Sequence, residues 1–210
     1  MKKLLILLFS IFFLSSPSVF ADDISDFSIE GISIGDSLLD YMTEDEILKE
    51  MERGNSNNNY FYLNEPKKYI DIYLFGSSST YEAGLSFFIK NTPTSEYITN
   101  KNEKYKILSV RGMKNYIKDF DGCIQKRNEI AEEVSKMFPN TQRYDNSYPH
   151  DVDPSGKSIR DDINFIFKSN DLINVICVDF EESLRIKMNW SEGLDIVIRS
   201  EEINKWFDDR

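Results

Sequence analysis

The chain has 210 residues and a formal net charge of −11, because 36 acidic side chains outnumber 25 lysines and arginines. This balance argues against nucleic acid and anionic membranes as partners, since both bind proteins through clustered Lys and Arg. The acidic composition favours solubility or, as an alternative, a cationic partner or divalent cations.

The first 21 residues follow the pattern of a cleavable secretory signal peptide. Lys2 and Lys3 precede an apolar run, Leu4–Leu14, and Val19-Phe20-Ala21 supplies small residues at the cleavage positions. The run has about half of the roughly 20 residues that a transmembrane helix needs. We expect residues 1–21 to be removed and residues 22–210 to form one α+β domain. That domain is expected in the periplasm or outside the cell, without stable membrane insertion.

The mature chain is expected to open with a short strand and two short helices. Phe27–Glu30 alternates apolar and polar residues, as a half-buried strand does. Asp36 can cap a helix that runs to Met42, and Thr43-x-x-Glu46 is a capping-box pattern that begins a second helix. The sequence therefore predicts a pair of short N-terminal helices.

Runs of aromatic and β-branched residues separated by short turns predict most of the sheet. A polar loop, Asn140–Ser158, divides these runs into two groups. Strands joined by short turns are antiparallel, because parallel strands need long crossovers. The predicted strands are Tyr60–Leu63, Tyr69–Phe75, Tyr81–Ile89, Tyr105–Met113, Ile163–Phe167, Leu172–Phe180, Leu184–Trp190 and Leu194–Ile198.

One long helix is predicted between the two groups of strands, over Lys118–Phe138. Its apolar residues recur at spacings of three and four, so it should pack on the sheet through one stripe. Ser200 can cap a final short helix. The predicted fold class is α+β, a mainly antiparallel sheet with one long helix packed on a face and a pair of short N-terminal helices.

Two cysteines, Cys123 and Cys177, remain after the signal peptide is removed. An exported chain with an even number of cysteines is expected to form disulfides. We therefore predict a Cys123–Cys177 bond that joins the long helix to the sheet, with two buried free thiols as the alternative.

Gly35-Asp36-Ser37-Leu38 resembles the block that names the GDSL family of esterases and lipases. The resemblance would make Ser37 a nucleophile, which needs a histidine base that the family holds in an Asp-x-x-His block. The only histidine is His150, and Ser147 stands three residues before it instead of Asp. The family fold is also a parallel sheet. We therefore predict no catalytic residue, with a turn and helix cap at this position and a Ser37 esterase as the alternative.

A second motif, Asp151–Asp162, resembles the opening of an EF-hand calcium loop, with oxygen-bearing residues at spacing two and Gly156 at position six. Asp162 stands where a bidentate Glu is usual. The same stretch holds Gly156-Lys157-Ser158, the end of a P-loop without its first glycine. A polar turn is the simpler interpretation. We assign no metal site and no cofactor, and keep an acidic calcium-binding module as an alternative.

The opening from Phe27 to Leu38 reads F-x-I-x-G-I-x-I-G-D-S-L, and Asp153-x-Ser155-Gly156-Lys157-Ser158 follows later. Both patterns are similar to a group of small exported bacterial proteins of unknown function. The resemblance implies no activity. We expect a non-enzymatic module that binds another envelope protein or a ligand, through a sheet face or an edge strand.

Overall fold

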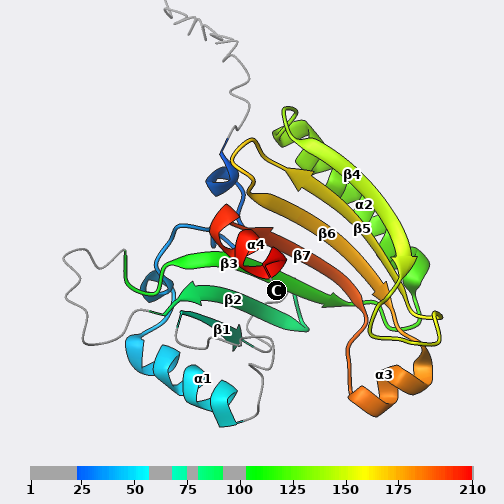
Figure 1. Ribbon diagram of the computed structural model, residues 1–210, viewed down its shortest axis with the longest axis horizontal. Helices are drawn as coiled ribbons and strands as arrows, with labels where there is room; N and C mark the ends of the chain where they lie inside the picture. Colours follow the sequence, from blue (N-terminus) through cyan, green and yellow to red (C-terminus); the bar gives the residue numbers. More distant parts are fainter. Residues whose placement is uncertain (1–22, 57–67, 75–79, 92–102, 210) are drawn as a thin grey trace, which may run out of the picture.

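The computed structural model describes residues 23–56, 68–74, 80–91 and 103–209. Their centre is one antiparallel sheet of seven strands in the order β1-β2-β3-β7-β6-β5-β4 (Figure 1). The predicted antiparallel α+β architecture is therefore confirmed. The strands are β1 (Tyr69–Leu74), β2 (Gly84–Lys90), β3 (Ile107–Asn115), β4 (Gln142–Pro149), β5 (Ile159–Ile166), β6 (Leu172–Asp179) and β7 (Gly193–Arg199).

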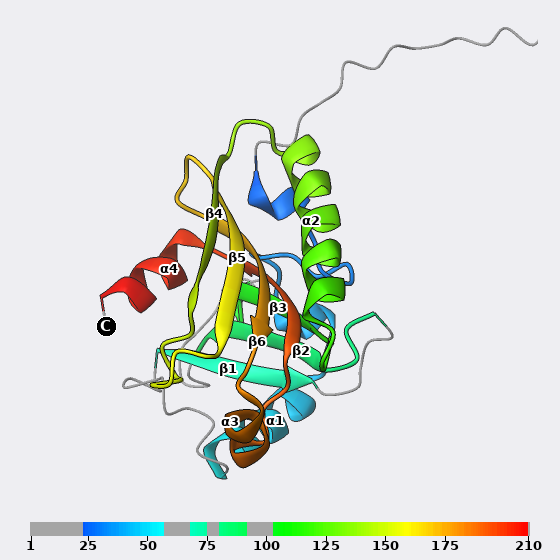
Figure 2. The ribbon, with the colours of Figure 1, turned by 90° about the vertical axis from the view of Figure 1, so that its right-hand side faces the viewer.

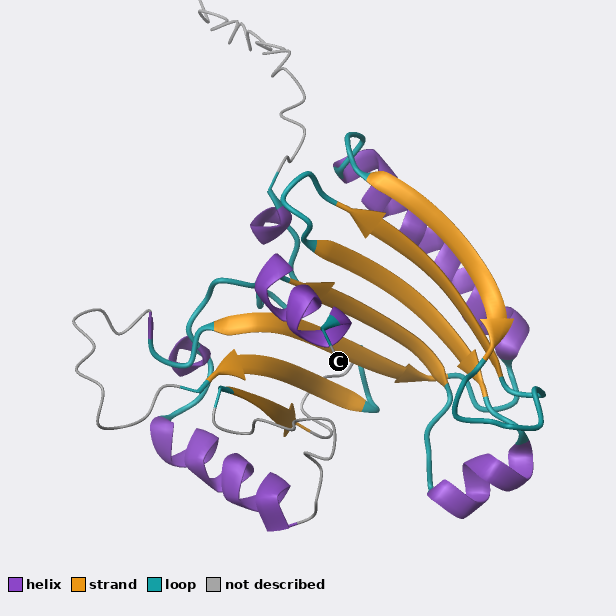
Figure 3. Cartoon of the chain, viewed as in Figure 1, coloured by secondary structure: helices purple, strands orange, loops and turns teal. Residues whose placement is uncertain are grey.

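Helices lie on both sides of this sheet (Figure 3). Viewed from the β4 edge, α2 lies on one side of the strands and α4 on the other (Figure 2). The α-helices in the described part of the chain are α1 (Glu44–Ser56), α2 (Phe120–Met137), α3 (Glu182–Met188) and α4 (Glu201–Asp208).

The predicted set of helices is wrong, although its long helix is present as α2. The first of the two expected N-terminal helices is a single 3-10 turn, Leu38–Asp40, whose cap is Ser37 rather than Asp36. The turn cannot extend, because Thr43 already caps α1 with the expected capping box, in which the Thr43 N–H donates to Glu46 Oε2 at 2.8 Å.

Several strand predictions also fail. Leu184–Trp190 is not a strand, since α3 occupies it, and the loop predicted at 140–158 contains the whole of β4. Phe27–Glu30 makes only an isolated bridge, Ile29 to Ile32. Tyr60–Leu63 lies outside the described residues. Ser200 is the N-cap of α4 as predicted, but its side chain makes no capping hydrogen bond.

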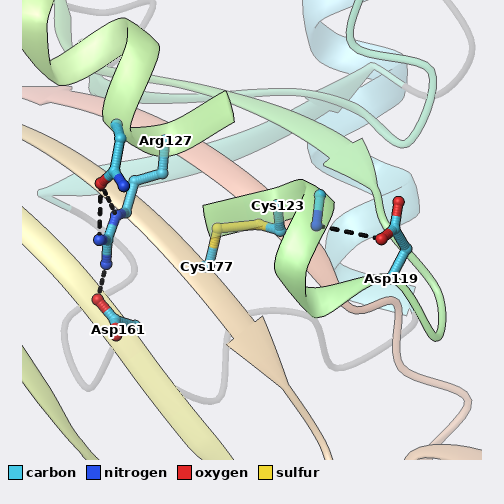
Figure 4. Close-up of a disulfide and its surroundings, with 7 residues drawn as sticks. Asp119, Cys123, Arg127, Asp161 and Cys177 are labelled. Atoms are coloured by element: carbon cyan, nitrogen blue, oxygen red, sulfur yellow. Dashed lines mark hydrogen bonds and ion pairs between the residues drawn. A yellow bond between two sulfur atoms is a disulfide. The ribbon is translucent and has the colours of Figure 1, made fainter. Parts of the chain in front are cut away.

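The main core lies between α2 and one face of the sheet. Alternate residues of β6, namely Ile173, Val175 and Cys177, point to this face and are fully buried, as are Cys123 and Ala131 of α2. The predicted Cys123–Cys177 disulfide is present, with a Cα–Cα distance of 6.0 Å. It joins α2 to β6 within the core (Figure 4).

An ion pair supports the same contact one helical turn along α2. The guanidinium of Arg127 pairs with the Asp161 carboxylate of β5 and donates to Asn128 Oδ1 at 2.8 Å (Figure 4). Both charged side chains are largely buried, at 10% and 21% exposed. The helix is thus held to two neighbouring strands by one covalent and one ionic contact.

The opposite face of the sheet has a different character. Here α4 packs through Ile203 and Trp206 on Tyr69 and Leu108. Because side chains alternate between faces along a strand, the residues of β6 between those of the core point to this second face. They include Asn174, which is 3% exposed. The second face therefore carries polar groups, and it holds the candidate site.

Candidate functional site

Three arginines from three strands share the sheet face opposite α2. Arg111 of β3 pairs in register with Val197 of β7, which places Arg111, Val197 and Arg199 on the same face. Arg160 and Asn164 are an even number of residues apart in β5, so their side chains lie on the same face. Asn164 lies opposite Asn174 of β6, and Asn174 lies opposite Val197, which places Arg160 on this face as well. We call this surface the arginine face. None of its three arginines was predicted as a site residue from the sequence.

Arg111 is paired within the sheet. Its Nη2 donates to Asp195 Oδ2 on the neighbouring β7. Burial opposes the charge of the guanidinium, but the attraction of Asp195 outweighs it and raises the pKa of Arg111. Arg111 therefore contributes a neutralised pair rather than a free charge.

Arg160 is paired as well, in a network centred on Asp162. This carboxylate accepts hydrogen bonds from Arg160 Nε (3.0 Å), Asn146 Nδ2 (3.1 Å), Tyr148 Oη (3.0 Å) and Asn164 Nδ2 (2.9 Å). Asp162 is only 3% exposed. Four donors match the acceptor capacity of a buried carboxylate, so the network is satisfied internally.

Arg199 differs from the other two arginines. Its guanidinium carbon lies 5.0 Å from the centroid of the Phe207 ring of α4. Among the described residues, no side chain or carbonyl forms an ion pair or hydrogen bond with it. Burial, with repulsion from Arg111 and Arg160, outweighs the attraction of Asp208 and Asp195 and lowers the pKa of Arg199 to about 10, so the group remains charged at neutral pH.

Asp71 of β1 is the second unusual charge on this face. It is 9% exposed, and its Oδ1 has no hydrogen-bond partner among the described residues. Burial raises the pKa of Asp71 to about 7, although a hydrogen bond with Tyr73 and the attraction of Arg111 act in the opposite direction. Near neutral pH this carboxyl is therefore partly protonated.

An apolar patch adjoins the charged groups. Ile176, Val178 and Val197 form a buried cluster with Phe180 packed against it. Val197 and Arg199 are alternate residues of one strand, so their Cα atoms lie about 7 Å apart. The arginine face thus places a cation that has no ion-pair partner among the described residues beside a buried apolar cluster.

Ser37 and His150, the nucleophile and base that a GDSL-type esterase would need, do not contact each other. Ser37 is 1% exposed, and its hydroxyl donates to the Lys104 carbonyl at 2.7 Å. The ring of His150 packs against Phe180 at 5.3 Å between centroids, and its Nδ1 accepts from the Val152 N–H at 3.4 Å. A serine nucleophile must reach its base by a hydrogen bond. Ser37 instead fixes the chain before the 3-10 turn.

We expect Ser37→Ala to leave ester hydrolysis at the background rate of the wild type. The change should lower the free energy of unfolding by about 1–2 kcal/mol, because it removes a cap and a buried hydrogen bond. Hydrolysis of 4-nitrophenyl acetate and urea denaturation measure the two effects. A rate above background that disappears in Ser37→Ala would contradict this assignment.

The calcium-type loop folds as a polar turn. The Asp153 carboxylate accepts hydrogen bonds from the N–H groups of Ser155 and Ser158 and from the Ser158 hydroxyl, each at 2.8 Å. The hydrogen bonds to Ser155 and Ser158 hold the pKa of Asp153 well below its usual range. Asp162, the last residue of the motif, belongs to the network on β5. Within the described residues, no group of three or more His, Cys, Asp or Glu side chains is arranged to hold a metal ion.

Comparisons with known proteins give no relative. No family model matches the chain, and neither the curated proteins nor the solved structures contain a match. No helix of the described part of the chain is long and apolar enough to cross a bilayer. The assignment of function therefore rests on the geometry of the arginine face.

Proposed function

We propose that this protein is an exported, non-enzymatic binding module whose site is the arginine face. Its ligand or partner carries an anionic group, a carboxylate or a phosphate, beside an apolar group. The observation that supports this proposal is the unpaired guanidinium of Arg199. Export is supported by the signal-type pattern of residues 1–21 and by the disulfide, which an oxidising compartment maintains.

The charge distribution supports an anionic ligand. The chain carries a net charge of −11, yet within the described residues no carboxylate forms an ion pair with Arg199, which Asp208 and Asp195 attract only at longer range, while Arg111 and Arg160 each have an ion-pair partner. A partly buried guanidinium loses hydration, and an incoming anion restores its hydrogen bonds. Arginine suits this task because its planar fork donates two parallel hydrogen bonds to a carboxylate or phosphate.

The buried apolar cluster beside Arg199 supports a ligand that carries an apolar group as well as a charge. Val197 lies on the same face as Arg199 and belongs to the cluster of Ile176 and Val178. Binding sites commonly combine an apolar lining with a few polar groups that fix orientation. Neither Ser37 nor His150 takes part in this surface as a catalytic pair, so we infer binding rather than turnover.

Calorimetric titration with three probes tests the proposal. Octanoate carries both features, acetate lacks the apolar chain, and 1-octanol lacks the charge. We expect octanoate to bind most tightly, and Arg199→Gln to weaken its binding by about tenfold because one charge-assisted contact is lost.

Lys126→Gln is the matched control. It removes the same charge from α2, on the other side of the sheet, where Lys126 pairs with Glu129 at 3.0 Å. This variant should bind octanoate like the wild type. Equal binding of octanoate by the wild type and Arg199→Gln, or no binding of any probe, would refute the site.

A further inference from the structure

The outer edge of β4 is an unpaired strand. β4 pairs with β5 along eight residues, and no described segment pairs with its other side. All eight residues are exposed. Figure 2 looks towards this edge and shows α2 and α4 on opposite sides of the sheet, so neither helix covers it. Such an edge offers free N–H and C=O groups to another strand.

The register determines which backbone groups point outward. The N–H of His150, which follows β4, donates to the Ser158 carbonyl at 2.8 Å. In an antiparallel pair, alternate residues bond across to the partner strand. The even-numbered residues of β4 therefore bond to β5, and the N–H and C=O groups of Arg143, Asp145 and Ser147 point away from the sheet.

These outward residues are self-complementary. Consider β4 paired with β4 of a second copy about a two-fold axis that passes through Tyr144. This arrangement places Arg143 opposite Asp145 of the second copy, and Asp145 opposite Arg143 of the second copy. Opposite charges directly across a strand pair stabilise it. Within one copy, Arg143 already pairs with Asp145 at 2.8 Å and with Glu132 of α2 at 3.0 Å.

The neighbouring registers are less favourable. Centring the axis on Arg143 or on Asp145 places two like charges opposite each other, which destabilises the pair. Centring it on Asn146 pairs Arg143 with Pro149, which has no N–H to donate. An axis centred between two residues places the outward N–H and C=O groups of one copy opposite residues of the other copy whose N–H and C=O groups already bond to β5. The register on Tyr144 is therefore the one that satisfies both the charges and the backbone.

We propose that two copies of this chain associate through β4 in this antiparallel register, which joins their sheets into one. Tyr144, which is 49% exposed, then packs against Tyr144 of the second copy. Charged residues on edge strands usually prevent association. Here their alternation along β4 instead selects a single register with a second copy. This inference is independent of the arginine face.

A pair of reversed charges tests the interface. We expect the wild type to dimerise with rising concentration in sedimentation-velocity runs. Arg143→Asp and Asp145→Arg should each weaken dimerisation by about tenfold or more, because both place like charges across the two-fold axis. An equimolar mixture of the two variants should dimerise again, since each residue then meets the opposite charge.

Ser147→Pro provides a variant without a charge change. It removes one outward N–H but no hydrogen bond to β5, so the chain should fold and its dimer should weaken. Circular dichroism checks that each variant is folded. A wild type that remains monomeric at about millimolar concentration, or a mixture that fails to associate, would overturn the interface.

Discussion

Reduction of the Cys123–Cys177 disulfide is expected to lower the free energy of unfolding by about 4 kcal/mol. The bond closes a loop with a sequence separation of 54 residues, and a cross-link of this span restricts the unfolded chain by about that amount in the chain-entropy model. The loss of stability should arise at the contact between α2 and β6. The Arg127–Asp161 ion pair between α2 and β5 would then remain as a polar link between this helix and the sheet.

Urea denaturation with and without dithiothreitol measures this contribution. Reduction retains both sulfur atoms, so it isolates the effect of the cross-link from the effect of packing. The variant Cys123→Ala/Cys177→Ala should be insensitive to the reductant and somewhat less stable than the reduced wild type, because it also loses buried volume. A change below about 1 kcal/mol on reduction would show that the cross-link contributes little.

Asp71→Asn is expected to stabilise the protein above pH 7 by about 2–4 kcal/mol. The carboxyl has a pKa of about 7 in the folded chain against 3.8 in its ordinary state. The folded state therefore binds the proton more tightly, so the stability that the neutral carboxyl confers is complete below about pH 4 and is lost as the pH rises through about 7. Asparagine keeps a similar shape and does not ionise.

Unfolding free energies at about pH 4 and about pH 9 test this effect. The wild type and Asp71→Asn should be of similar stability at the lower pH and differ at the higher one. Asp209→Asn, which removes an exposed carboxylate after α4, should show the same difference from the wild type at both values. A flat difference for Asp71→Asn would mean that Asp71 ionises normally in the folded chain.

The parts of the fold that the sequence predicted are those with a clear period and a buried face. α2 carries Cys123, Ala131 and Val134 on one stripe, and this stripe is the surface that packs on the sheet. β6 is buried along both faces, whereas β7 alternates between buried core residues and a second face on which Asp195 and Arg199 are partly exposed. Cys123 and Cys177 both lie at core-facing positions, but the disulfide was predicted from the even number of cysteines in a chain expected to be exported.

Where a pattern did not correspond to burial, the prediction failed. Leu184, Ile186 and Met188 alternate as in a strand, but Ile186 is 64% exposed and Met188 is 46% exposed. The segment forms α3 because Glu181 caps its first turn and Asn189 adopts a left-handed conformation at its end. Asparagine in that place is a helix stop signal that the sequence did contain.

β4 was missed for the converse reason. Its residues are polar and exposed on both faces, so no hydrophobic alternation marks it. The arginine face could not be predicted from the sequence either. Arg111, Arg160 and Arg199 are far apart in the chain, and the register of β3, β7, β6 and β5 places them on one face. Sequence alone does not supply that register.

The place of β7 in the sheet has a consequence for the order of folding. Among the described strands β7 is the last in sequence, yet it lies between β3 and β6 and joins the two three-stranded meanders. Its pairing with β3 joins Arg199 to Ser109, a long-range contact of the kind that slows folding. The sheet therefore cannot close until residue 199 is available for pairing, whatever the order in which the two meanders form.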